Sequence, residues 1–193
     1  MPNLYVIAGC NGAGKTTASY TILPEMLNCQ EFINADEIAK GLSPFDPDRA
    51  TIEAGRIMLT KVKKNLKDTI DFAFETTLST KSYRNIIRQS KSLGYKVTLL
   101  YFWLESVDLA IERVRTRVSE GGHDIPNNVI RQRYYSGIKN LFEIYIPICD
   151  YWLIMDNSEI DSQIICEGMQ DTWLDIKNSI TFERIKEQRV NDK

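Results

Sequence analysis

Short apolar runs alternate with longer segments of helical periodicity along most of the chain. The apolar runs have the length of strands, and they cover residues 4–8, 31–34, 70–77, 95–104 and 151–156. The segments between them repeat their apolar residues every three or four positions, as amphipathic helices do, beginning near residues 14, 36, 43, 80, 106 and 127. Strands separated by helices of this length favour a parallel sheet that is covered on both faces.

Local signals mark where several of these helices begin and end. Asp46 and Pro47 suit the N-cap and the first position of a long helix within residues 43–68. Gly94 is expected to close the helix over residues 80–93. The segment at about residues 159–193 reads as a helical tail. Together these elements predict a single α/β domain over residues 1–193, in three layers, with a five-stranded parallel sheet between two layers of helices.

The composition is that of an ordinary globular protein, with 43% hydrophobic and 26% charged residues. The formal net charge of −2 gives no global field that would recruit nucleic acid or anionic lipid. The longest apolar run, residues 97–104, is too short to span a bilayer. The start of the chain lacks the basic and apolar regions of a secretion signal. We therefore expect a cytoplasmic protein without a membrane partner.

The cysteines and the histidine argue against a zinc site. Cys10, Cys29, Cys149 and Cys166 show no C-x-x-C spacing, and the single histidine, His123, cannot build such a site alone. His123 is expected to make a local hydrogen bond rather than to act as a base. Four cysteines without a pairing pattern fit a reducing compartment.

Gly9, Gly14, Lys15 and Thr16 form the pattern G-x-x-x-x-G-K-[ST], which follows an apolar strand and opens a helix. Glycines allow the backbone N–H groups to wrap around a triphosphate, and the helix directs its positive dipole end at the same charge. Lys15 is expected to reach the β- and γ-phosphates, and Thr16 to offer its hydroxyl to Mg²⁺. The alternative is a glycine-rich turn with a solvated lysine. The pattern predicts a nucleoside triphosphate and Mg²⁺ as ligands, and the expected nucleotide-binding residues are Gly9, Asn11, Gly12, Ala13, Gly14, Lys15, Thr16 and Thr17.

Other sequence patterns narrow the class of P-loop protein. The N-K-x-D guanine reader of GTPases and the L-S-G-G-Q-like signature of ABC ATPases are both missing from the sequence. The compact kinase-like P-loop NTPases remain, in which acids at the ends of neighbouring strands surround the transferred phosphate.

Asp36 follows the second strand and Glu75 ends the third. Both are therefore expected at the carboxyl ends of the strands, where ligands bind in an open parallel sheet. A kinase needs a carboxylate that orients or deprotonates the attacking hydroxyl, and Asp36 is the candidate. Glu37, next to it, and Glu75 are expected to contact the substrate. The alternative role for Asp36 is that of a helix N-cap.

Five arginines surround Gly121 and Gly122, which would act as the hinges of a helical lid at about residues 113–133. At 100° per residue, Arg117 and Arg131 lie nearest the apolar stripes of their helices, whereas Arg133 points away. We therefore expect Arg117 and Arg131 to offset charge on the γ-phosphate during transfer. The alternative is a solvated helical hairpin with salt-bridged arginines.

Several stretches together resemble the zeta-toxin-like P-loop kinases. They are "GCNGAGKTT", "FINADEIA", "FAFETTLS", "RVRTRVSEGGHDIP", "IRQRYYSGIKNL" and "DYWLIMDNS", and they lie in the family's order over about residues 4–158. The best-studied members phosphorylate a hydroxyl of UDP-N-acetylglucosamine and are neutralised by a small helical antitoxin.

The resemblance implies a doubly wound kinase core and roles for particular residues. Asp36 would be the base-like acid, Glu75 and Thr77 would contact the substrate, and the catalytic arginines would lie within residues 113–133. Asn157, after the last strand, would lie on the adenine side of the nucleotide.

The predicted function is therefore ATP-dependent transfer of the γ-phosphate to a hydroxyl of a small molecule, with UDP-N-acetylglucosamine as one candidate and an antitoxin as a candidate partner. The first alternative is a nucleotide-binding regulatory or toxin–antitoxin module with little catalysis. The second is a polynucleotide kinase, which needs an aromatic and basic groove. The arginine hairpin, near Tyr134 and Tyr135, is the only hint of such a groove, so nucleic acid is not expected as a partner.

Overall fold

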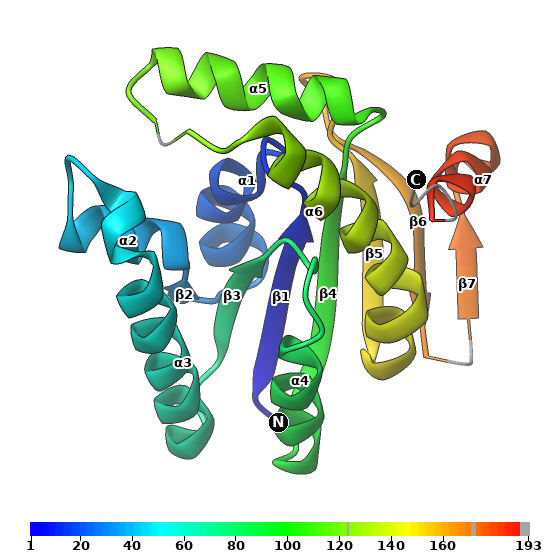
Figure 1. The fold of residues 1–193 in the computed structure, drawn as a ribbon. Coiled ribbons are helices and arrows are strands. Elements are labelled where there is room, and N and C mark those ends of the chain that lie inside the picture. Colours follow the sequence, from blue (N-terminus) through cyan, green and yellow to red (C-terminus); the bar gives the residue numbers. More distant parts are fainter. Residues whose placement is uncertain (123, 171–172, 190–193) are drawn as a thin grey trace.

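The structure is a computed structural model, and it describes residues 1–122, 124–170 and 173–189. His123 therefore lies outside the described residues. Within them, seven strands form one sheet in the order β2-β3-β1-β4-β5-β6-β7 (Figure 1). The strands are β1 (Asn3–Gly9), β2 (Glu31–Ile33), β3 (Phe72–Thr76), β4 (Lys96–Trp103), β5 (Tyr151–Asp156), β6 (Gln163–Met169) and β7 (Trp173–Ile176).

The first five strands pair in parallel, as the alternation of strands and helices predicts. The prediction of only five strands is wrong, because β6 and β7 add to the edge at β5 in antiparallel pairing. They occupy part of the segment that was expected to be helical. The helical part of the tail is shorter, and it consists of α7 (Ser179–Gln188).

The helices cover the parallel sheet on both faces. They are α1 (Lys15–Thr21), α2 (Ala35–Leu42), α3 (Thr51–Asp68), α4 (Tyr83–Ser92), α5 (Val107–Ser119) and α6 (Asn127–Asn140). The β1–β2 connection runs in the opposite direction along the sheet to the later parallel connections. Because such crossovers are right-handed, α1 covers the face opposite to α3, α4 and α6 (Figure 1).

Two helices differ from their predicted form at their ends. The stretch predicted to begin at Asp46 opens with a 3-10 turn, Pro47–Ala50, before α3 starts at Thr51. Asp46 precedes this turn without capping it through its side chain. Helix α6 continues as a π-helical turn, Leu141–Tyr145, and a 3-10 turn, Ile146–Ile148, that lead into β5.

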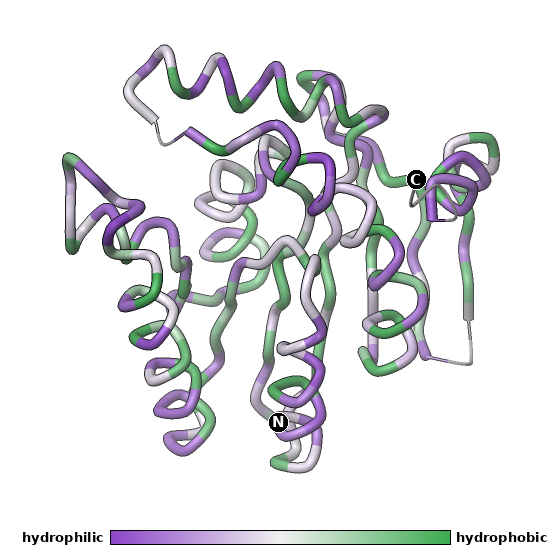
Figure 2. Tube along the Cα trace, in the orientation of Figure 1, coloured by the Kyte–Doolittle hydropathy of each residue, from purple (hydrophilic) through white to green (hydrophobic). Residues whose placement is uncertain are grey.

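Burial follows the hydrophobic pattern closely. Strand β1 lies at the centre of the parallel part of the sheet, and six of its seven residues are buried. The helices are amphipathic, and the tube in Figure 2 alternates between hydrophilic and hydrophobic residues along α3 and α5. No helix in the described part of the chain is long and apolar enough to cross a membrane. The carboxyl ends of the parallel strands all lie at the same end of the sheet, next to the amino end of α1.

Candidate functional site

The loop between β1 and α1 adopts positive φ angles at Gly9, Gly12 and Gly14, a backbone conformation that favours glycine. Gly9 has a φ angle of 145°, and a Cβ atom there would lie 2.3 Å from the carbonyl oxygen of Phe102 on β4. Gly14 has a φ angle of 76°, and a Cβ atom there would lie 2.6 Å from the side-chain nitrogen of Asn157. The backbone of Phe102 excludes a side chain at Gly9, and the positive φ angle favours glycine at Gly14, so the backbone stays open to a ligand at the start of α1.

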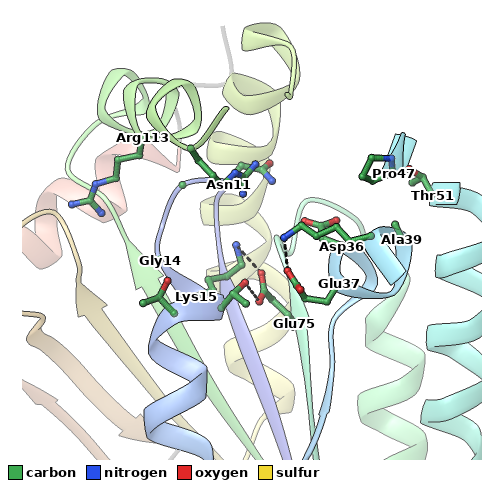
Figure 3. A pocket seen from close by; sticks show the side chains of 15 residues that line it. Asn11, Gly14, Lys15, Asp36, Glu37, Ala39, Pro47, Thr51, Glu75 and Arg113 are labelled. Carbon is green, nitrogen blue, oxygen red and sulfur yellow. Dashed lines mark hydrogen bonds and ion pairs between the residues drawn. The ribbon is translucent and has the colours of Figure 1, made fainter. Parts of the chain in front are cut away.

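Lys15, the first residue of α1, is buried with a relative exposure of 6%. Its ammonium donates to the carbonyl oxygen of Cys10 over 2.9 Å and lies 3.4 Å from Oε1 of Glu75. A buried cation needs such partners because its desolvation is costly. Figure 3 shows the side chains of Lys15 and Glu75 pointing toward one another below the loop.

Glu75 brings the end of β3 to the P-loop. Its Oε2 accepts a hydrogen bond from the Thr16 hydroxyl over 2.7 Å. A hydroxyl and a carboxylate are the hard oxygen donors that suit Mg²⁺, which takes few protein ligands and keeps phosphates and waters around it. The described residues contain no cluster of three or more acidic, histidine or cysteine side chains that could hold a metal alone. The donor set therefore fits a metal ion that arrives with a nucleotide.

Asp36 lies in the first turn of α2 and faces the P-loop across the site (Figure 3). Its alternative role as N-cap is not observed. Asn34 is the cap, because its Oδ1 accepts the backbone N–H groups of Asp36 and Glu37. Glu37 forms an ion pair with Lys40 at 2.6 Å, with both side chains exposed by more than 40%.

Two adjoining hollows make up the site. The larger, the P-loop hollow, has a volume of ≈ 390 Å³ and extends from the P-loop to α2 and the start of α3. The smaller, the hydroxyl hollow, has a volume of ≈ 210 Å³ and lies between α2, the end of β3 and α6. Both are lined by Asn11, Lys15, Asp36 and Glu75, so these four side chains stand where the hollows meet. The P-loop hollow is also lined by Gly12, Gly14, Thr16, Thr17, Glu37, Lys40, Pro47, Thr51, Arg113 and Arg117.

The hydroxyl hollow takes its name from the residues that follow β3. Its lining includes Thr76, Thr77, Ser79, Thr80, Tyr83 and Arg133. The Thr77 and Ser79 hydroxyls lie 2.8 Å apart. Burial raises the pKa of the Tyr83 phenol, and the charge of Asp36 raises it further, so this group remains a hydrogen-bond donor at neutral pH. These hydroxyls offer donors and acceptors to a polar ligand, next to the charged side chains of Lys15, Asp36, Glu75 and Arg133.

The backbone after β3 turns sharply to form this wall. Leu78 has a φ angle of 55°, which is unusual for a residue other than glycine, and it is fully buried. Its carbonyl oxygen accepts a hydrogen bond from the Asn140 side chain of α6 over 2.7 Å. Surrounding structure therefore holds a strained turn in place beside the hollow.

The arginines are arranged differently from the prediction in one respect. Arg117 lines the P-loop hollow, as expected. Arg131 faces outward and pairs with Asp108 at 2.8 Å, with 52% of its side chain exposed. Arg133, expected to point away, lines the hydroxyl hollow and donates to Oδ1 of Asn11 over 3.1 Å. Both arginines flank the buried stripe of α6, and periodicity alone does not say which flank faces the P-loop.

Asn157 and Arg113 connect the end of β5 to the P-loop. Asn157 donates to the carbonyl oxygen of Ala13 over 2.7 Å. Arg113 donates to the carbonyl oxygens of Asn157 and Ser158 at 2.7 and 2.6 Å. Asn157 therefore lies beside the P-loop. Its contact with the adenine side of a nucleotide, which the family resemblance implies, stays a prediction.

Sequence reasoning missed the roles of Asn34, Arg133 and Lys40 in building the site. Only Asn34 carries a usable signal, since asparagine two residues before an acid in the first turn of a helix is a common N-cap. Cys10 is in the loop but is 3% exposed, and burial raises the pKa of its thiol to about 11, which leaves it protonated and unreactive at neutral pH.

The fold is shared with solved structures of low sequence identity. A chain of the AvrRxo1-ORF1:AvrRxo1-ORF2 complex aligns with a TM-score of 0.77 at 16% identity, and the match covers 100% of this chain. This chain spans 66% of that one. The same complex has also been solved with ATP. A structure of the PezAT chromosomal toxin–antitoxin system of Streptococcus pneumoniae aligns with a TM-score of 0.64 at 15% identity, over 97% of this chain and 86% of the other.

Sequence comparison gives the closer relation. An uncharacterized protein of Haemophilus influenzae is 32% identical over 126 residues, which make up 65% of this chain and 88% of that protein. A family model described as Zeta toxin matches residues 1–145, which include the P-loop, both acids and the arginine hairpin. The chain belongs to the zeta toxin family.

Proposed function

We propose that the protein is a Mg²⁺-dependent phosphotransferase that moves the γ-phosphate of ATP to a hydroxyl of a small molecule. The observation that carries this proposal is the junction of the two hollows. Lys15, Asp36 and Glu75 line both, so a cation for phosphate and two carboxylates lie between a nucleotide-sized space and a wall of hydroxyls. Binding of nucleotide alone would not need acids at this junction.

Each side chain has a distinct role in the proposed reaction. Lys15 and the N–H groups at the start of α1 hold the β- and γ-phosphates. Thr16, with Glu75 beside it, would hold Mg²⁺, which supplies charge neutralisation between the phosphates. Asn157 lies on the base side of the nucleotide. Thr77, Glu37 and Glu75 position the acceptor.

Asp36 orients the acceptor hydroxyl and accepts its proton as the oxygen attacks the γ-phosphorus. The bond from that phosphorus to the bridging oxygen breaks, and ADP leaves with the electron pair. Negative charge spreads over the transferred group meanwhile, and Arg117 and Arg133 are placed to offset it from two sides. Arg131 has no part in this scheme because it faces solvent.

The acceptor and the partner are inferred from the family. UDP-N-acetylglucosamine is the first acceptor to test, and a sugar or polyol that matches the hydroxyl hollow is the second. PezAT is described as a toxin–antitoxin system, and we propose by analogy that a small inhibitory protein binds this chain. The four cysteines are all free and buried, which agrees with a reducing cytoplasm.

A panel experiment tests the proposal. The protein is incubated with labelled ATP, Mg²⁺ and, in turn, UDP-sugars, free sugars, nucleosides and oligonucleotides. We expect label on one small-molecule hydroxyl, and none with Lys15→Ala, which also loses ATP affinity in calorimetry. Lys63→Ala, on the exposed side of α3, is the matched control. Binding of ATP without transfer to any acceptor would leave a regulatory module, and label on oligonucleotides would indicate a polynucleotide kinase.

A further inference from the structure

Asn34 is a buried side chain, 6% exposed, that bonds to two parts of the site at once. Its Nδ2 donates to Oε2 of Glu75 over 2.8 Å and to Oγ1 of Thr16 over 3.2 Å. Its Oδ1 accepts the backbone N–H groups of Asp36 at 2.8 Å and Glu37 at 3.3 Å. One rigid amide therefore connects the Thr16–Glu75 pair to the first turn of α2.

The surrounding groups fix the orientation of this amide. Reversing it would place the carbonyl oxygen against the Glu75 carboxylate and the amino group against the two backbone donors. Both contacts would be repulsive. The side chain must therefore supply an acceptor on one side and a donor on the other.

Capping α2 does not by itself require asparagine. Serine, threonine and aspartate cap helices about as well, because a single acceptor oxygen is enough. Aspartate has no donor, and the only donor of serine or threonine is the hydroxyl of the capping oxygen itself, one bond short of the position of Nδ2. The second half of the amide thus contributes something other than helix stability.

We propose that Asn34 is a positioning residue that fixes Asp36 relative to the phosphate cradle. It does so by tying the start of α2 to Glu75 and Thr16, the pair that faces the P-loop hollow. This inference rests on the proposed function, in which Asp36 must lie within reach of the acceptor hydroxyl. A misplacement of about 1 Å at such a group costs roughly 100-fold in rate.

Three substitutions separate the two functions of Asn34, which are to cap α2 and to connect α2 to Glu75 and Thr16. Asn34→Ala removes both. Asn34→Ser keeps a capping oxygen, removes the Nδ2 donor that reaches Glu75 and adds no charge. Asn34→Asp keeps the cap in a side chain of the same size but replaces the donor with a second carboxylate. The matched control is Asn178, which caps α7 through a bond to the N–H of Thr181 at 3.0 Å and is exposed, outside both hollows.

We expect Asn34→Ala and Asn178→Ala both to lower Tm, and only the former to reduce turnover of Mg²⁺·ATP with the acceptor found in the panel. Asn34→Ser should recover most of the Tm while kcat stays down by roughly 10- to 100-fold. Asn34→Asp keeps the cap but sets a second carboxylate against Glu75, so its Tm should stay low and its kcat should fall at least as far. ATP affinity in calorimetry should stay within about threefold, since the P-loop is intact.

A second measurement does not depend on turnover. Hydrogen exchange in α2 is compared with and without Mg²⁺ and a non-hydrolysable ATP analogue. In the wild-type chain the analogue should slow exchange at the start of α2, and in Asn34→Ser this effect should disappear although the analogue still binds.

Two results would overturn the inference. One is a kcat that returns together with Tm in Asn34→Ser, which would make Asn34 a helix cap only. The other is equal protection of α2 by the analogue in Asn34→Ser and in the wild type. If the wild type transfers phosphate to no acceptor, the proposed function fails, and the exchange comparison still decides whether Asn34 couples the two parts.

Discussion

Lys15 shows how much of the site is decided by single residues. It is nearly buried, and the protein itself supplies its counter-charge through Glu75 at 3.4 Å. A phosphate that enters the P-loop hollow would compete with Glu75 for the same ammonium. If the chain binds nucleotide as proposed, its affinity would reflect an exchange of partners rather than the filling of an empty positive site.

The acid at the junction gives the first prediction. Asp36→Asn should lower phosphate transfer by roughly 10²- to 10⁴-fold, because the amide cannot accept the proton of the acceptor. ATP binding should change little in calorimetry. Glu53→Gln, which changes an exposed acid of α3 outside both hollows, is the control and should keep its activity. If Asp36→Asn retains most of the activity, its carboxylate has no role in the chemistry.

The second prediction separates two arginines on one helix. Arg133→Ala should reduce transfer by roughly 10²-fold, since it removes a cation that lines the junction side of the site. Arg131→Ala should leave the rate unchanged and cost at most about 1 kcal/mol of stability, because it breaks only an exposed ion pair. Steady-state rates at saturating ATP measure both. The opposite order would restore Arg131 as the inward-facing arginine.

These residues also show which parts of the site can be predicted from the sequence. Gly9, Gly14 and Lys15 were predictable because the P-loop is a local pattern with a local geometry. Arg133 was not, since the choice between the two flanks of α6 depends on how that helix lies across β1 and β3. The hydrogen bond from Asn34 to Glu75 was not predictable either, because the two residues are 41 positions apart in the sequence.

At the scale of elements, helix α6 packs unusually close to the end of β3. A Cβ atom at Gly137 would lie 2.7 Å from the carbonyl oxygen of Thr77. The wall of the hydroxyl hollow therefore depends on a glycine in the middle of a helix. The gain from close packing offsets the conformational cost of that glycine.

A matched pair of glycines tests this packing. Gly137→Ala should destabilise the fold by about 1–3 kcal/mol, because α6 or Thr77 must shift. Gly55→Ala in α3 has no heavy atom within 4 Å of the added methyl group, and it should stabilise the fold by about 0.5–1 kcal/mol. Chemical denaturation gives both values. Equal changes in stability for the two variants would mean that α6 accommodates a methyl group at Gly137 without displacing Thr77.

The order of strands and helices up to β5 was predictable because each strand there is a short apolar run. The β6–β7 hairpin was missed for a physical reason. Its residues Ile164, Leu174 and Ile176 are all more than 39% exposed, so the hairpin lacks a clean alternation of buried and exposed positions. Its pairing depends on the edge of β5, which no local pattern reveals.

At the scale of the whole molecule, the tail is built into the core although the family model ends at residue 145. Cys166 on β6 and Ile185 on α7 are fully buried. Gln188 accepts hydrogen bonds from the ring nitrogen of Trp103 at 2.9 Å and the hydroxyl of Tyr134 at 3.2 Å. The end of α7 therefore contacts both β4 and α6.

Two isoleucines of α7 test whether the tail unfolds with the rest. Ile185→Ala should lower the free energy of unfolding by about 2–5 kcal/mol, because it leaves a cavity in the shared core. Ile180→Ala, at a position that is 84% exposed, should stay within about 0.5 kcal/mol. One cooperative transition is expected in both. A separate early transition in Ile185→Ala would show that the tail is an independent unit.

The meeting of two hollows at the same side chains has a consequence for the order of events. If nucleotide occupies the P-loop hollow and the acceptor occupies the hydroxyl hollow, as proposed, the two can occupy the protein together. The proposed transfer then runs through a ternary complex, with a single displacement at phosphorus and no phosphoenzyme. We therefore expect sequential rather than ping-pong kinetics.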